Sequence, residues 1–169
     1  LEKFLKIKQI DFEVFVALGY SEMNKKREKF YNLFKSKKYK FTNFIHPDAN
    51  CYFNKIGKNN FIMDNVSINP FSDIGDNNIF WSNVIIGHHN IIGNNNFFSG
   101  NSTISGNCKI NNNCFFGVNS STRDNLEINN FCFIDANQYV PKTLKIKTFF
   151  NIQVNPKLKL STFQVFNIK

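Results

Sequence analysis

The sequence predicts a mainly β protein, a left-handed parallel β-helix of hexapeptide repeats preceded by a small, truncated α/β subdomain. Two observations favour this fold class. Large apolar residues recur at every sixth position from Ile56 to Leu158, and small or turn-tolerant residues recur two positions before them. We expect the subdomain over residues 1–45, the β-helix over 46–160 and a C-terminal capping tail over 161–169.

The apolar grid is continuous in the sequence. Seventeen of its eighteen members are large and apolar, and Thr122 is the exception. The grid reads Ile56, Ile62, Ile68, Ile74, Phe80, Ile86, Ile92, Phe98, Ile104, Ile110, Phe116, Thr122, Ile128, Ile134, Val140, Ile146, Ile152 and Leu158. A disordered asparagine-rich tail would not keep this pattern.

The period of six indicates how the coil is built. Six residues make one short strand and one corner, so three units close an 18-residue triangular turn. Residues 18 apart, such as Ile56 and Ile74, then stack in columns, and only stacked turns bury them. Each buried side chain contributes roughly 1.5–3 kcal/mol, and asparagine suits the corners because it tolerates positive φ.

Three of the four cysteines fall on the second grid. Cys108, Cys114 and Cys132 are small enough to fill the inside of a corner, whereas Cys51 lies before the continuous repeat. No CxxC pair or zinc-ligand spacing occurs. We therefore expect reduced thiols in a cytoplasmic protein, with no metal site.

The segment before the coil has strand and helix patterns. Residues 11–18 read as a strand, Ser21 is a candidate N-cap for a helix ending near Phe34, and residues 41–45 read as a second strand. After Leu158, residues 161–169 alternate apolar with polar side chains, which suits a cap on the last turn or a strand that pairs with another subunit.

Composition limits the partners. The 169 residues carry a formal net charge of +9, which attracts anions such as nucleotide and cofactor phosphates unless the lysines are merely solvated. Arg27 and Arg123 are the only arginines, which argues against nucleic-acid binding. No apolar run is long enough for a membrane span.

Four short motifs carry a resemblance to a known family. They are Ile45-His46-Pro47, Ile86-Gly87-His88-His89, Ile104-Ser105-Gly106 and Phe116-Gly117-Val118-Asn119. With the hexapeptide grid they resemble the left-handed β-helix acyltransferases, in particular the sugar O- and N-acyltransferases related to sialic-acid O-acetyltransferase and UDP-4-amino-sugar N-acetyltransferase. The resemblance implies a homotrimer that binds acetyl-CoA between adjacent coils and acylates a sugar, often nucleotide-linked, in surface-polysaccharide biosynthesis. The glycine-rich GxGGxG turn that binds the nucleotide in the family does not occur in this sequence.

His88 matches the catalytic histidine of that family. Imidazole is a suitable general base near neutral pH, and the register places Gly106 one full turn above it. Gly106 matches the glycine whose N–H contacts the thioester carbonyl, so it is the candidate oxyanion donor and cofactor contact. No Ser-His-Asp or Cys-His motif is evident, which favours direct transfer.

His89 departs from the family pattern, where an acidic residue often follows the catalytic histidine. Asp64, Asp73 or Asp76 from nearby turns is a candidate for the missing carboxylate. Alternatively, His89 contacts the acceptor or cofactor, or has only a structural role.

The resemblance also implies a set of cofactor contacts. Phe97 and Asn101 lie where some relatives have a second histidine. Arg123 is a candidate phosphate ligand or an ion-pair partner of Asp124. Pro156 and Lys157 lie in a stretch that resembles the end of the family's coil, near the CoA adenine and phosphates.

Other functions fit the fold less well. A β-helix enzyme that acylates a non-sugar small molecule and a non-catalytic scaffold are the alternatives. An ice-binding face would need regular threonine ladders, and a β-helix carbonic anhydrase would need three zinc histidines across an interface, whereas two of the three histidines here are adjacent.

Overall fold

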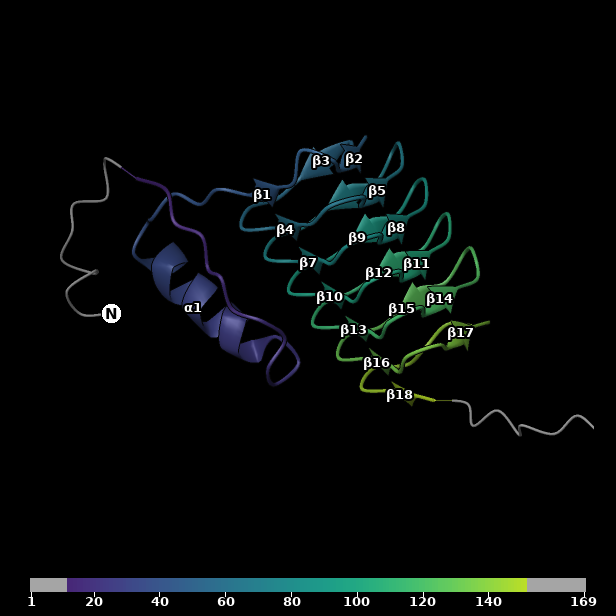
Figure 1. Ribbon diagram of the computed structural model, residues 1–169. Coiled ribbons are helices and arrows are strands. Elements are labelled where there is room, and N and C mark those ends of the chain that lie inside the picture. Colours follow the sequence, from purple (N-terminus) through teal and green to yellow (C-terminus); the bar gives the residue numbers. More distant parts are fainter. Residues whose placement is uncertain (1–11, 152–169) are drawn as a thin grey trace, which may run out of the picture.

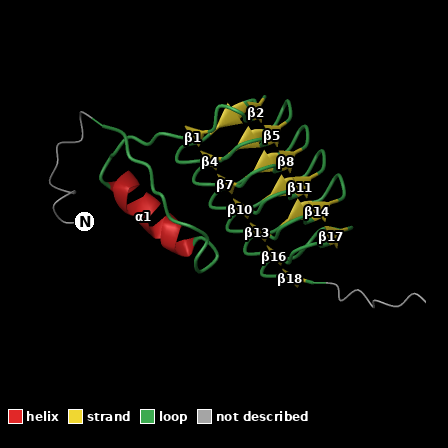
Figure 2. Cartoon of the chain, in the orientation of Figure 1, coloured by secondary structure: helices red, strands yellow, loops and turns green. Residues whose placement is uncertain are grey.

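Residues 12–151 are described by a computed structural model, and they form a parallel β-helix with one flanking helix (Figures 1 and 2). Every strand has two residues, and the strands stack into three parallel sheets that form the walls of a triangular coil. The predicted left-handed β-helix is confirmed. Within this part of the chain no helix is long and apolar enough to cross a membrane.

The chain visits the three walls in turn. The first wall contains β1 (Phe44–Ile45), β4 (Phe61–Ile62), β7 (Ile79–Phe80), β10 (Phe97–Phe98), β13 (Phe115–Phe116), β16 (Phe133–Ile134) and β18 (Phe149–Phe150). The second wall contains β2 (Asn50–Cys51), β5 (Ser67–Ile68), β8 (Ile85–Ile86), β11 (Thr103–Ile104), β14 (Ser121–Thr122) and β17 (Tyr139–Val140). The third wall contains β3 (Lys55–Ile56), β6 (Asp73–Ile74), β9 (Ile91–Ile92), β12 (Lys109–Ile110) and β15 (Glu127–Ile128).

The predicted columns form the core. Ile92 pairs with Ile110, Ile86 pairs with Ile104, and the rings of Phe80 and Phe98 stack with centroids 4.9 Å apart. The grid residues from Ile62 to Val140 are almost completely buried. Burial of these side chains therefore holds successive turns together.

The last turn is two residues shorter than the turn before it, which corrects the prediction of an unbroken six-residue spacing up to Leu158. Leu144 rather than Ile146 lies against Ile128, and Phe150 rather than Ile152 lies against Ile134. The corner after Val140 contains Pro141 and is two residues shorter than the others, so Ile146 is left 56% exposed. Ile152, Leu158 and the tail over 161–169 lie outside the described residues.

One position in every corner has a left-handed backbone. Positive φ recurs at each sixth residue from Asn59 to Asn137. Two runs of three asparagines, 94–96 and 111–113, each contain one such residue, Asn95 and Asn113. Eleven of these fourteen positions are asparagine, and the exceptions are Phe71, His89 and Phe131. Asparagine occupies these corners because it tolerates positive φ better than most residues.

The corner joining the third and first walls carries a column of buried asparagines. Asn59 donates to Asn77 (2.6 Å) and Asn77 donates to Asn95 (2.7 Å), so each amide satisfies the next. The segment before the coil docks here, since the Asn59 carboxamide oxygen accepts from Val16 N–H and the Asn24 side chain donates to Asn95 C=O.

The flanking helix α1 (Lys25–Ser36) differs from the prediction at its start. Ser21 is not its N-cap, because the helix begins after Asn24, which has positive φ and makes no side-chain cap. Val14 and Phe41 form one parallel bridge, whereas Phe44 and Ile45 already belong to the first wall of the coil. The subdomain is thus a short parallel pairing with a helix between its two segments.

Candidate functional site

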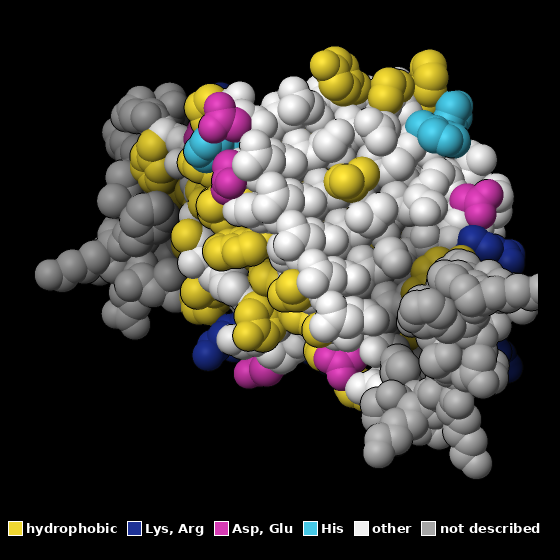
Figure 3. All heavy atoms as spheres, turned by 45° about the vertical axis from the view of Figure 1, so that its right-hand side comes forward, with side chains coloured by type: hydrophobic (Ala, Val, Ile, Leu, Met, Phe, Trp, Pro, Cys, Tyr) yellow, Lys and Arg dark blue, Asp and Glu magenta, His cyan; other side chains and the backbone are white. Residues whose placement is uncertain are grey.

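His88 lies at the corner that joins the second and third walls, between β8 and β9. Ile86 is buried on the second wall, and Gly87 and His88 then turn outward. The His88 side chain is exposed, as predicted. In Figure 3 the histidines lie at two separate places on the displayed face, with mostly polar surface between them.

The structure brings His88 and Gly106 together, as the register predicts. A Cβ atom on Gly106 would lie 2.7 Å from both Cε1 and Nε2 of His88 and 3.2 Å from Nδ1. Only a residue without a side chain fits against the imidazole in this position. The shape of this corner therefore depends on glycine at position 106.

The N–H group of Gly106 has no hydrogen-bond acceptor among the described residues. At the corner joining the third and first walls, by contrast, the equivalent N–H groups of Asp76 and Asn94 donate to the asparagine side chain 18 residues later. Above Gly106 the corresponding residue is Asp124, whose carboxylate accepts from Asn125 instead. A backbone donor without an acceptor, on a residue that lies against an imidazole, is what oxyanion stabilisation requires.

Thr122 alters the strand pairing next to this donor. Ser105 N–H donates to the Thr122 hydroxyl (3.1 Å), and the Ser105 hydroxyl donates to Thr122 C=O (2.6 Å). In the turn below, Gly87 N–H donates directly to Ile104 C=O (2.7 Å). The exception in the apolar grid is thus a buried hydroxyl that fixes the residue preceding Gly106.

His89 contacts His88 directly. The two Nδ1 atoms are 3.0 Å apart, and the rings meet edge to face. The His89 ring also packs on Phe71, one turn below, with centroids 4.7 Å apart. The sequence did not single out Phe71, although it interrupts the asparagines that recur at every sixth position.

The three candidate carboxylates do not serve His88, which corrects that expectation. Asp73 accepts from Asn54 (2.8 Å). Asp64 accepts from the Ser82 hydroxyl (2.6 Å), which lowers the pKa of Asp64. Burial opposes ionisation of Asp76, but the Lys58 N–H, the Tyr31 hydroxyl and Lys35 together lower its pKa.

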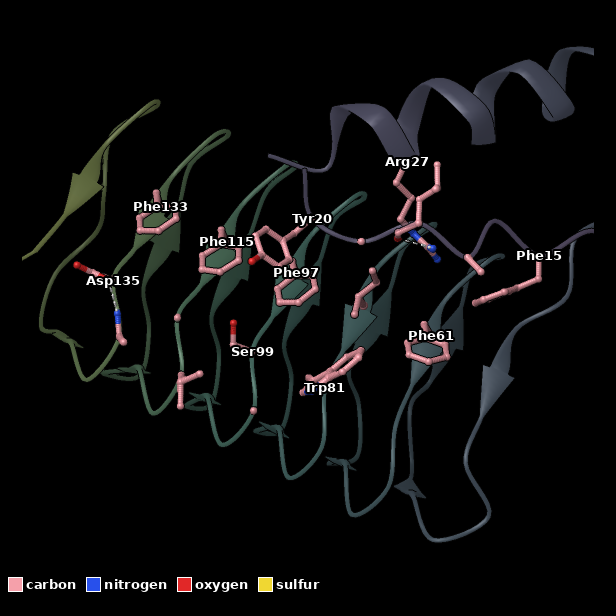
Figure 4. A pocket seen from close by; sticks show the side chains of 18 residues that line it. Phe15, Tyr20, Arg27, Phe61, Trp81, Phe97, Ser99, Phe115, Phe133 and Asp135 are labelled. Atoms are coloured by element: carbon pink, nitrogen blue, oxygen red, sulfur yellow. Dashed lines mark hydrogen bonds between the residues drawn. The ribbon is translucent and has the colours of Figure 1, made fainter. Parts of the chain in front are cut away.

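A groove of about 830 Å³ lies along the outer face of the first wall, beneath the segment before the coil (Figure 4). Tyr20 covers one side of the groove and packs on Phe97 and Phe115, with ring centroids 4.9 and 5.3 Å away. The ring floor consists of Phe61, Trp81, Phe97, Phe115 and Phe133. Among the described residues, Phe97 is thus the one predicted cofactor residue that lines this groove.

Arg27 lies at one end of the groove and is almost completely buried. It donates to the carbonyl oxygens of Val16, Leu18 and Asn59, and its Nε has no partner among the described residues. Burial lowers the pKa of Arg27 to about 10. No acidic side chain forms an ion pair with it in the described part of the chain, so this end of the groove is cationic.

Two further predicted cofactor residues, Asn101 and Arg123, do not line the groove. Asn101 is exposed at the corner after β10. Arg123 is exposed at the corner that carries His88, in the turn above Gly106, and forms no ion pair with Asp124 among the residues described. Pro156 and Lys157 lie outside the described residues. No group of three possible metal ligands occurs between residues 12 and 151.

The corner that carries His88 lies opposite the first wall, which carries Phe97. His88 follows β8 and precedes β9, whereas Phe97 belongs to β10. Within one chain the imidazole and the groove therefore face different directions. The two features can share one substrate only if two copies of the chain lie side by side.

Comparisons with known proteins agree with the repeat and the fold. A family model described as bacterial transferase hexapeptide (six repeats) matches residues 55–88. No curated protein matches the chain by sequence. The repeat predicted from the sequence is thereby confirmed.

Solved structures share the fold at low identity. The acetyltransferase domain of PglB from Neisseria gonorrhoeae FA1090 superposes with a TM-score of 0.79 at 18% identity, covering 86% of this chain and 71% of that one. PerB from Caulobacter crescentus, in complex with CoA and GDP-perosamine, gives 0.72 at 24%, covering 78% and 63%. WeeI from Acinetobacter baumannii AYE gives 0.77 at 15%, covering 86% and 70%. The match thus spans less than two thirds of the PerB chain.

Proposed function

We propose that this protein is an acetyl-CoA-dependent acyltransferase that transfers an acetyl group directly to a hydroxyl or amino group of a sugar. The observation that carries the proposal is the His88 imidazole lying against Gly106, whose backbone N–H has no acceptor among the described residues. The solved PglB domain has been captured with acetyl coenzyme A and PerB with CoA and GDP-perosamine, which supports these substrate classes.

The chemistry requires a base, an oxyanion donor and a groove. Nε2 of His88 takes the proton of the acceptor hydroxyl or amine as that atom attacks the thioester carbonyl carbon. The Gly106 N–H donates to the oxyanion of the tetrahedral intermediate. When the carbon–sulfur bond breaks, the proton on His88 passes to the departing CoA sulfur, which restores the neutral imidazole.

The active unit in this proposal is a homotrimer. His88 and the first-wall groove lie on opposite sides of one coil, so the His88 corner of one copy would face the groove of the next. The pantetheine arm of acetyl-CoA would lie on the ring floor around Phe97, and Arg27 would balance negative charge at the groove's end. A cytoplasmic location and a role in surface-polysaccharide biosynthesis remain predictions.

Turnover of acetyl-CoA tests the proposal. Release of free CoA thiol is measured against nucleotide sugars and free glycans, with wild-type protein, His88→Ala and His46→Ala. We expect His88→Ala to lower kcat by about 10²–10⁴-fold, the range typical of general acid–base groups, and His46→Ala to have little effect. Full activity in His88→Ala would contradict the mechanism, and turnover of non-sugar acceptors alone would favour the alternative substrate class.

The size of the particle in solution tests the arrangement. Light scattering coupled to gel filtration should give the mass of three chains. A monomer that turns over acetyl-CoA would contradict the shared site. A stable trimer without turnover of any acceptor would favour the non-catalytic scaffold.

A further inference from the structure

Two of the three non-asparagine residues in the left-handed corner positions, Phe71 and His89, touch each other, and His89 also touches His88. Phe71 and His89 have φ of 65° and 56°, values that a bulky residue such as phenylalanine rarely adopts, although histidine tolerates them better. The third exception, Phe131, has a separate partner, since Lys25 of the flanking helix lies over its ring. Asn107 and Asn125, the next two residues of the same column, return to the usual choice.

We propose that His89 is a positioning residue that fixes the proton and orientation of His88, and that Phe71 supports it. This inference rests on the proposed function of His88 as the general base. Backbone strain that persists at one place, with a side chain aimed at a reactive group, is typical of functional sites.

The distance between the Nδ1 atoms of His88 and His89 leaves room for only one proton between them. With Nδ1 atoms 3.0 Å apart, one nitrogen donates and the other accepts. If His88 donates from Nδ1, its Nε2 carries a lone pair and can take a proton from the acceptor. If His89 donated instead, His88 would carry its proton on Nε2 and could not act as a base from that atom.

Three contacts hold the two histidines in this arrangement. Its ring packs on Phe71, its backbone N–H donates to Pro70 C=O (3.1 Å), and the next turn holds the His88 backbone through the Asn107 N–H (3.0 Å). The His88 ring itself lies against Gly106. The imidazole is thus confined by Gly106 on one side and by His89 on another.

The hydrogen bond also acts during the reaction. Once His88 has accepted the proton, its Nδ1–H donates from a charged ring, and charge-assisted hydrogen bonds are stronger than neutral ones. A neutral His89 acceptor therefore stabilises the state that follows proton transfer. No carboxylate of the described residues takes this place.

The first test does not depend on activity. Nitrogen-15 NMR of the three histidines reports which ring nitrogen carries the proton, with His46→Asn and His88→Ala used for assignment. We expect wild-type His88 to be protonated on Nδ1. In His89→Phe, which keeps the packing on Phe71 but removes the acceptor, the His88 proton should move largely to Nε2. An unchanged His88 tautomer in His89→Phe would overturn the proposal.

The second test separates positioning from folding. We expect His89→Phe to lower kcat about 10-fold or more with little change in the KM for acetyl-CoA, and His89→Asp to recover most of that loss because its carboxylate can accept the Nδ1–H. His89→Asn is the control for the backbone, because asparagine suits this corner best but does not keep the ring. If kcat stayed near wild type in His89→Phe and fell in His89→Asn, His89 would have a packing role only, and the proposal would be overturned. If the wild-type protein turns over no acceptor, the proposed function fails, and the tautomer comparison still decides whether His89 sets the proton on His88.

Discussion

The His88 imidazole lies against the Cα of Gly106, so closely that an added methyl group would come within 2.7 Å of two ring atoms. Gly106→Ala keeps the backbone N–H but must displace the imidazole. A shift of about 1 Å at a reacting group can cost on the order of 10²-fold in rate. We therefore expect kcat to fall about 10²-fold while the thermal unfolding midpoint changes little, because the exposed ring can swing away.

A double-mutant cycle supplies the control for this variant. In a His88→Ala background the clash disappears, so Gly106→Ala should lower kcat no further. Additive losses in the double variant would show that Gly106 acts independently of the His88 ring.

The sequence predicted this juxtaposition because one period governs both core and surface. The spacing that stacks Ile92 on Ile110 also stacks His88 under Gly106, so a surface contact followed from the apolar grid. The same spacing failed after Val140, where Pro141 shortens a corner and brings Leu144 rather than Ile146 onto Ile128. A continuous count of apolar residues cannot detect such a change when another apolar residue lies two positions away.

The groove was less predictable than the corner. Its floor lies one residue before the buried grid, at positions such as Phe97 and Phe115, which the apolar grid does not include. Its other side comes from Tyr20 and Arg27, which are joined to the coil by long-range hydrogen bonds and ring contacts that no local pattern specifies.

Thr122 is expected to stabilise the turn that carries Gly106. Thr122→Val preserves the volume but leaves Ser105 N–H without its acceptor, at a cost of about 1–3 kcal/mol. Thr122→Ser keeps the hydroxyl and should cost less in urea unfolding at equilibrium. If the serine variant were the less stable of the two, the side-chain methyl rather than the hydrogen bond would be the important group.

Substitution in the buried asparagine column should lower the free energy of unfolding more than substitution at an exposed corner. Asn77→Ala removes hydrogen bonds to Asn59 and Asn95 and places alanine at φ 63°, which together should cost about 2–4 kcal/mol. Asn83→Ala is the matched control, because Asn83 has φ 62° but an exposed side chain, and should cost about 1 kcal/mol. Equal losses in chemical denaturation would assign the whole effect to the backbone.

Asp76 makes attachment of the flanking helix dependent on pH. Its carboxylate accepts from the Tyr31 hydroxyl (2.8 Å) and Lys35 (3.1 Å) of α1, and the pKa of Asp76 is lowered. A lowered pKa in the folded state means that this stabilisation is present above the pKa of the unfolded chain, about 3.9, and is lost as pH falls below it.

Asp76→Asn should therefore lower the free energy of unfolding at pH 7 by about 1–2 kcal/mol, a value reduced for partial exposure of the pair. The difference between variant and wild type should shrink at pH 3. Asp48→Asn, which changes an exposed carboxylate, is the control for general charge effects. A constant difference between pH 7 and pH 3 would exclude ionisation of Asp76 as the cause.

The single tryptophan reports on the first-wall groove. Trp81 is 45% exposed and lines the groove beside Phe61 and Phe97, so CoA bound on the ring floor should change its fluorescence. Val118 also lines the groove and is 47% exposed. Val118→Glu would place a negative charge in the groove and should weaken binding of the anionic CoA at least 10-fold, whereas Tyr52→Glu at the start of the coil should leave it unchanged. Saturable CoA binding that leaves Trp81 fluorescence unaltered, with equal affinity in Val118→Glu, would place the cofactor on another surface of the coil.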